Sequence, residues 1–143
     1  MHWGSMFRKI KRNAFATMIA LTCSVPLRAN SDAEVKDYLI TTTQVVQQHI
    51  ELLDAADNAG KAAEVLKKYA AAMKPVMKKS AALKKKYPKA FAGESLKVEM
   101  EAMHKTMMTM NGKLGQAKRK FGHDKKFKQG EKALLRAGLF GSR

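Results

Sequence analysis

Methionine and histidine side chains are the groups of this 143-residue chain whose spacing suits ligand chemistry. Seven of the ten methionines lie in the second half of the chain, with His104 among them. Thioether sulfur and imidazole nitrogen are soft ligands that suit Cu(I) and need no thiol. Met100, His104 and Met108 are spaced four residues apart, so a helix would place them on one face. These three residues, supported by Met103 or Met107, form a candidate Cu(I) site.

The same methionines fit the core of a helical bundle, and we favour this interpretation. Eight residues alternate at spacings of four and three: Leu96, Met100, Met103, Met107, Met110, Leu114, Ala117 and Phe121. That rhythm is typical of the seam between packed helices, where methionine is an adaptable filler. Only His104 and Met108 lie clearly off the stripe. The segment Met103–Met110 (MHKTMMTM) also resembles the Met- and His-rich stretches of periplasmic copper-handling proteins, so copper is the alternative to having no cofactor.

Helical spacing of apolar residues recurs in three long segments that would carry these side chains, residues 31–57, 61–87 and 95–121. Ser31, with Glu34 three residues later, forms a capping box that predicts the start of the first helix. A shorter helix is expected at residues 124–137. Matched lengths and short connections predict an all-α fold, an antiparallel three-helix bundle of long helices with a short C-terminal fourth helix.

Proline and glycine bear on how regular these helices are. Pro75 is expected to kink the second helix, because proline lacks an amide donor and crowds the preceding turn. Tyr87-Pro88 is expected to end it. Gly122 and Gly130 weaken the prediction of the fourth helix, since glycine has a low helix propensity.

His49 lies on the inward stripe of the first segment. Folding the helices back on one another places it near Tyr69 and near Met110 or Leu114. A haem held between His and Met inside the bundle is one interpretation. We favour the other, a buried neutral imidazole that forms a hydrogen bond with the Tyr69 hydroxyl.

Charge is distributed unevenly along a chain whose formal net charge is +16. Residues 30–60 hold six acids and one lysine, whereas residues 61–143 hold 22 Lys plus Arg and six acids. Internal neutralisation accounts for part of this, and the remaining positive field would attract polyanions. We expect anion binding at two clusters: Lys84, Lys85, Lys86, Lys118, Arg119 and Lys120.

The N-terminus has the order of a secretory signal peptide. Residues 6–12 are basic, residues 14–25 carry no charge, and Pro26 precedes a small residue, Ala29, suited to cleavage. The apolar run is too short for a membrane span, which needs roughly 20 residues. We therefore assign residues 1–29 to a signal peptide and residues 30–143 to a single helical-bundle domain, periplasmic or secreted.

Cys23 is the one cysteine of the chain. Lipid anchoring at this residue is an alternative that we do not favour, because Ala20-Leu21-Thr22 matches a bacterial lipobox only loosely. Cleavage after Ala29 would leave a mature chain without cysteine, which suits an oxidising compartment.

Enzymatic activity is not expected, because the chain has no Gly-rich phosphate loop, no nucleophile elbow and no His-Glu-x-x-His motif. The segment Met73–Pro88 (MKPVMKKSAALKKKYP) resembles a part of small, uncharacterised, exported Lys- and Met-rich helical proteins of Gram-negative bacteria. The expected partner is an anionic envelope lipid or polymer, or an acidic protein surface. Export argues against nucleic acid, and a homo-oligomer is left open.

Overall fold

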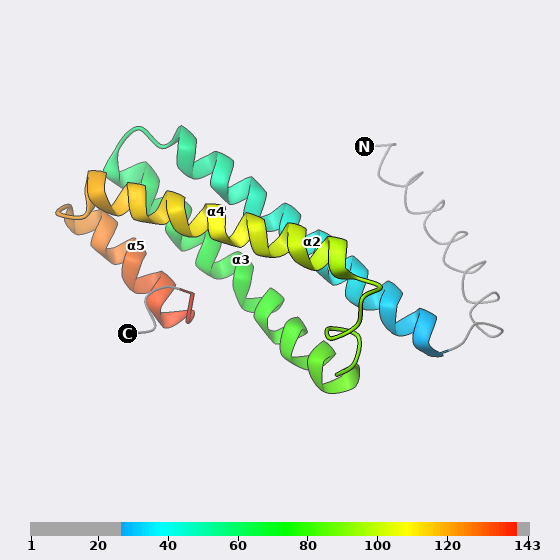
Figure 1. The fold of residues 1–143 in the computed structure, drawn as a ribbon. Coiled ribbons are helices and arrows are strands. Elements are labelled where there is room, and N and C mark those ends of the chain that lie inside the picture. The colour runs from blue at the N-terminus through cyan, green and yellow to red at the C-terminus, as the bar shows by residue number, and fades with distance from the viewer. Residues whose placement is uncertain (1–26, 140–143) are drawn as a thin grey trace, which may run out of the picture.

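The computed structural model describes residues 27–139, which form four helices (Figure 1). In chain order they are α2 (Leu27–Ala55), α3 (Ala59–Lys86), α4 (Lys97–Phe121) and α5 (Lys125–Arg136). Residues 27–139 contain no strand, so the predicted all-α class is confirmed. Residues 1–26 of the predicted signal peptide (residues 1–29), with Cys23, lie outside the described residues.

The first helix begins earlier than the capping box predicts. α2 starts at Leu27 and passes through Ser31, so the assignment of Ser31 as its N-cap is wrong. The four residues before Ser31 include Leu, Arg and Ala, which are good helix formers and extend the helix backwards. Asp32, the residue after Ser31, also lies inside α2, and its carboxylate accepts a hydrogen bond from the Ser95 hydroxyl at 3.0 Å. The other predicted helix boundaries differ from those observed by at most two residues.

A side-chain cap at the start of α3 and a proline just after its end fix the bounds of this helix. The Asn58 carboxamide oxygen accepts from the Lys61 amide at 2.9 Å and begins the helix. The helix continues through Pro75, which is exposed, and ends before Tyr87-Pro88 as predicted. Pro88 follows the C-cap closely, where a residue that cannot continue a helix is common.

Two apolar clusters hold the helices together. The larger one joins all four helices, and the smaller one joins the start of α2 to the end of α3 and to the 87–96 connection. The largest fully buried side chains are Phe127, Leu39, Leu66, Met73, Met110 and Leu134. α2 packs against both α3 and α4, and α5 packs against α3. Some apolar side chains of the helices remain exposed, among them Leu52 of α2 (41%), Met77 of α3 (39%) and Leu135 of α5 (50%).

α5 folds back along α3, as Figure 1 shows, and Gly130 is the residue that lets it approach. A Cβ at Gly130 would lie 3.0 Å from the Ala63 carbonyl oxygen and 3.1 Å from Leu66 Cβ. Such distances are tighter than ordinary van der Waals contact, so a larger residue would push the helices apart. The glycine that weakened the prediction of this helix is therefore the one its packing needs.

None of the helices in residues 27–139 combines the length and the apolar character needed to cross a bilayer.

Candidate functional site

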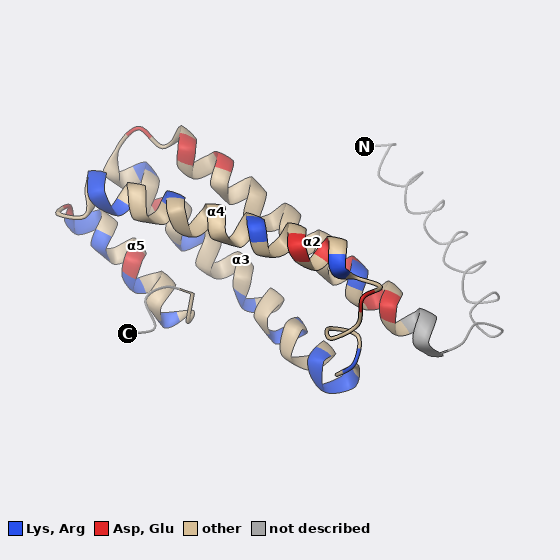
Figure 2. Ribbon diagram, in the orientation of Figure 1, with Lys and Arg blue, Asp and Glu red and all other residues tan. Residues whose placement is uncertain are grey.

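The two predicted cationic clusters lie at opposite ends of the molecule (Figure 2). Lys84, Lys85 and Lys86 form the last turn of α3, and Lys118, Arg119 and Lys120 form the last turn of α4. Cations are favoured there because the C-terminus of a helix carries partial negative charge. The structure therefore does not bring the six predicted residues into one site.

The cluster at the end of α3 is largely engaged within the protein. Lys86 Nζ lies 3.7 Å from a Glu34 carboxylate oxygen and 5.0 Å from the Tyr87 ring centroid. Hydrogen bonding with the Tyr87 side chain, and then the charge of Glu34, raise the pKa of Lys86. Lys84 Nζ lies 5.8 Å from the Phe91 ring centroid. Two of these three lysines thus have partners in the connection or in α2.

The end of α4 meets the start of α5, and several cations without ion-pair partners lie together there. Lys118 pairs with Glu131 at 3.6 Å. Among residues 27–139, no ion pair involves the five other cations of this end. We call this set the basic end: Arg119, Lys120, Lys125, Lys126 and Lys128.

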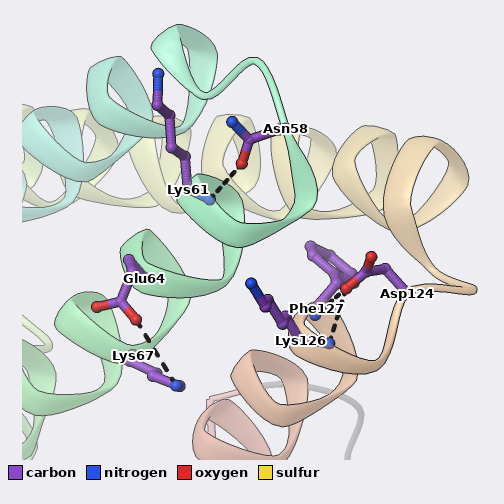
Figure 3. Close-up of polar contacts among 7 residues, drawn as sticks. All are labelled: Asn58, Lys61, Glu64, Lys67, Asp124, Lys126 and Phe127. Carbon is purple, nitrogen blue, oxygen red and sulfur yellow. Dashed lines mark hydrogen bonds and ion pairs between the residues drawn. The ribbon is translucent and has the colours of Figure 1, made fainter.

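Helix stability does not explain the three lysines that α5 contributes to the basic end. They occupy its first turn, where the partial positive charge of a helix N-terminus disfavours cations. Asp124 offsets this by capping the helix, because its carboxylate accepts from the Lys126 amide at 2.7 Å and the Phe127 amide at 3.4 Å (Figure 3). The predicted site omitted Lys125, Lys126 and Lys128, although their run of charge is visible in the sequence.

A groove of about 430 Å³ opens beside the basic end, between the C-terminal turns of α2 and α4. Apolar side chains, including Leu53 and Phe121, line it together with Arg119 and Lys120. Lys113 also lines it and pairs with Asp54 at 2.9 Å. The groove therefore offers unpaired cations next to apolar surface, an arrangement that suits an anion attached to an apolar body.

All four methionines of the α4 stripe pack as predicted. Met110 is fully buried in the larger cluster, Met107 lies half-buried against it, and Met100 and Met103 lie half-buried against the smaller cluster. The Tyr69 hydroxyl donates to Met107 Sδ at 3.9 Å. Core packing therefore explains these residues without a metal.

The two remaining candidate copper ligands are exposed side chains of α4, His104 and Met108, of which Met108 is 60% exposed. Met100 and His104 line one groove of about 710 Å³, formed by α4 and the 87–96 connection. Within residues 27–139, no three His, Cys, Asp or Glu side chains are grouped so as to hold a metal ion. Any metal bound here would depend on thioether sulfur.

His49 is buried next to Tyr69, as predicted, with ring centroids 5.4 Å apart. The predicted hydrogen bond between them is wrong. His49 Nδ1 donates instead to the Val45 carbonyl at 2.8 Å, one helical turn earlier, and the Tyr69 hydroxyl is directed to Met107. Burial raises the pKa of Tyr69 to about 12.

The chain matches no protein-family model, no functionally described protein and no solved structure. Its function must therefore be argued from its own residues.

Proposed function

We propose that the protein is an exported, non-enzymatic helical-bundle protein that binds an anionic component of the cell envelope through its basic helices. The observation that carries this proposal is the basic end, where five cations from α4 and α5 have no ion-pair partner among residues 27–139. A folded protein gains little from such a concentration of like charge, which favours binding of polyanions.

The bundle is the scaffold in this proposal. We take α2, α3 and α4 as an antiparallel three-helix bundle and α5 as its short fourth helix. This assignment is supported by the packing of α2 against both α3 and α4, and by the short connection between α2 and α3. The α4–α5 connection is also short, which keeps the cations of the two helices at one end of the molecule.

Anionic lipid is the partner that the groove next to the basic end favours. Arg119 and Lys120 would bind a phosphate, and the apolar lining, with Leu53 and Phe121, would contact the adjoining part of the lipid. A cation near an anionic surface contributes about 1 kcal/mol. Several together would give a measurable affinity that falls as salt screens the charges.

The basic and apolar residues at the N-terminus support export in this proposal, because they have the order of a signal peptide. We expect the exported chain to begin at Asn30, which intact-mass measurement of the periplasmic or secreted protein would show. A full-length chain retained in the cytoplasm would contradict this part of the proposal.

Vesicle binding tests the proposed partner. The full chain would be titrated with phosphatidylethanolamine vesicles, with and without phosphatidylglycerol, at increasing salt. We expect binding only when phosphatidylglycerol is present, weakening steadily with salt because the contacts are electrostatic. Equal binding to both vesicles, or binding that salt does not change, would overturn the proposal. Salt-sensitive binding of an acidic protein but not of either vesicle would replace lipid with a protein partner.

A further inference from the structure

Three grooves follow one another around the basic end. The groove between α2 and α4, of about 430 Å³, shares Lys120 and Phe121 with a second groove of about 400 Å³. Ala59, the first residue of α3, also lines this second groove, which we call the middle groove. Its sequence neighbours Asn58 and Gly60 line a third groove, of about 480 Å³, between α3 and α5. The middle groove therefore connects the other two.

The α2–α4 groove is more positive than the middle groove. Arg119 and Lys120 line the α2–α4 groove and have no ion-pair partner among residues 27–139. The middle groove holds one lysine, Lys120, and one carboxylate, that of Asp124, beside the rings of Phe121 and His123. An anionic group is therefore attracted more strongly to the α2–α4 groove.

Lys126 gives the α3–α5 groove a free cation of its own. Two other lysines of this groove, Lys61 and Lys67, are paired with carboxylates. Lys126 forms no ion pair with residues 27–139, and its side chain extends from α5 toward the start of α3 (Figure 3). Its Cδ atom would lie 3.8 Å from a Cβ at Gly60. Unpaired cations thus lie on both sides of the middle groove.

These two groups of cations are close enough to act on one molecule. Lys120 and Asp124 line the same middle groove, and the Asp124 carboxylate accepts a hydrogen bond from the Lys126 amide at 2.7 Å. The backbone of Lys126 therefore lies beside that groove. Lysine carries its charge on a flexible four-carbon stem, so both ammonium groups can approach anions held on either side of the middle groove.

We propose that the basic end binds a lipid that carries two phosphates in one molecule, with one phosphate at Arg119 and Lys120 and the other at Lys126. This inference rests on the proposed function and names the class of lipid. A lipid with one phosphate would occupy only one of the two cationic grooves. In a diphosphatidyl lipid a glycerol bridge joins the phosphates, and the middle groove, lined in part by Ala59 and Phe121, would hold that bridge.

The test compares two kinds of phosphatidylethanolamine vesicle, one containing phosphatidylglycerol and the other cardiolipin, a diphosphatidyl lipid. Both carry the same phosphate charge, so general attraction to an anionic surface is equal. We expect the full chain to bind the cardiolipin vesicles at least about fivefold more tightly, because linking two binding groups raises affinity.

Substitutions test the two phosphate positions. Lys126→Gln, and the double variant Arg119→Gln with Lys120→Gln, should each bring the two affinities together, because one phosphate then lacks its cation. Lys128→Gln is the control, since Lys128 is an exposed lysine of the same helix that lines none of the three grooves. It should weaken binding to both vesicles alike and keep the preference. The N-terminal residues are common to all variants, so their contribution cancels in the comparison.

The outcomes separate this inference from the proposed function. Equal binding of the wild type to the two kinds of vesicle would overturn the inference and leave binding of anionic lipid in place. A preference for cardiolipin that Lys126→Gln keeps as fully as Lys128→Gln would overturn it as well. Binding to neither vesicle would contradict the proposed function and this inference together.

Discussion

At the scale of single residues, Tyr69 is a buried side chain whose surroundings change its pKa. Its side chain is 3% exposed, its hydroxyl contacts Met107 Sδ, and its ring lies beside that of His49. Burial disfavours the charged phenolate and raises the pKa of Tyr69 from 10.0 to about 12. The unfolded chain, in which this phenol is hydrated, has no such shift.

This shift predicts a loss of stability at alkaline pH. Between pH 10 and about 12 the unfolded chain releases the Tyr69 proton while the folded protein retains it. The free energy of unfolding must therefore fall as pH rises through this window, by up to about 1.4 kcal/mol per pH unit. Urea unfolding below and within the window would measure the fall.

Tyr69→Phe isolates this effect, because it keeps the ring and removes the ionisable hydroxyl. The variant should lose less stability than the wild type between pH 10 and about 12. Deprotonation of the lysines affects both proteins alike, so it cancels in the comparison. Identical pH dependence in the two proteins would show that Tyr69 does not titrate as the structure implies.

At the scale of the elements, the position of α5 depends on a glycine. Gly130→Ala would place a methyl group 3.0 Å from the Ala63 carbonyl oxygen, which cannot move without disturbing α3. Overpacking of this kind costs roughly 1–3 kcal/mol, and we expect a net destabilisation despite the better helix propensity of alanine. Gly112→Ala is the matched control, because nothing lies within 4 Å of its added Cβ.

The two glycine variants should change stability in opposite directions. Gly112→Ala should raise the free energy of unfolding by about 0.5–1 kcal/mol, since alanine is the better helix former at an exposed site. Thermal and urea unfolding would compare both variants with the wild type. Stabilisation by Gly130→Ala would contradict the close packing of α5 on α3.

Capping of α5 gives a second prediction for an element. Asp124→Ala removes the acceptor for the Lys126 and Phe127 amides and should cost about 1 kcal/mol. Asp124→Asn retains a side-chain oxygen and should cost much less, because Asn and Asp are comparable N-caps. Equal losses in the two variants would mean that the charge of Asp124, rather than its hydrogen bonds, stabilises the helix.

Periodicity in the sequence predicted the helical class and most helix boundaries, because the helices are amphipathic. It did not predict the start of α2, since Ser31 is compatible with both a cap and a helix interior. It also missed the packing of α5 along α3. Spacing shows which face of a helix is apolar but not which neighbour covers it, and the role of Gly130 depends on that neighbour.

The candidate site was predictable only in part, for a related reason. Runs of lysine are visible in the sequence, but their partners are brought near by folding. Glu34 of α2 engages Lys86 at the end of α3, and Glu131 of α5 engages Lys118 of α4. The distinction between paired and unpaired cations, on which the basic end rests, appears only in three dimensions.

On the scale of the whole molecule, the acidic residues of α2 neutralise part of the positive charge. Asp54 pairs with Lys113 of α4 at 2.9 Å, and Glu34 pairs with Lys86 of α3. In the turn that follows α2, Asp57 pairs with Lys61 at 3.1 Å, which lowers the pKa of Asp57. These contacts leave the unpaired cations of Arg119, Lys120 and the start of α5 together at one end (Figure 2).

The most direct test of the anion-binding proposal compares two variants with equal charge loss on phosphatidylglycerol-containing vesicles. One is Lys120→Gln, Lys125→Gln and Lys126→Gln, which alters the basic end. The other is Lys84→Gln, Lys85→Gln and Lys86→Gln, which alters the opposite end. We predict that the first variant binds more weakly by up to about 3 kcal/mol, taking about 1 kcal/mol for each cation. The second should lose much less, and equal losses, or a greater loss in the second, would contradict the assignment of anion binding to the basic end.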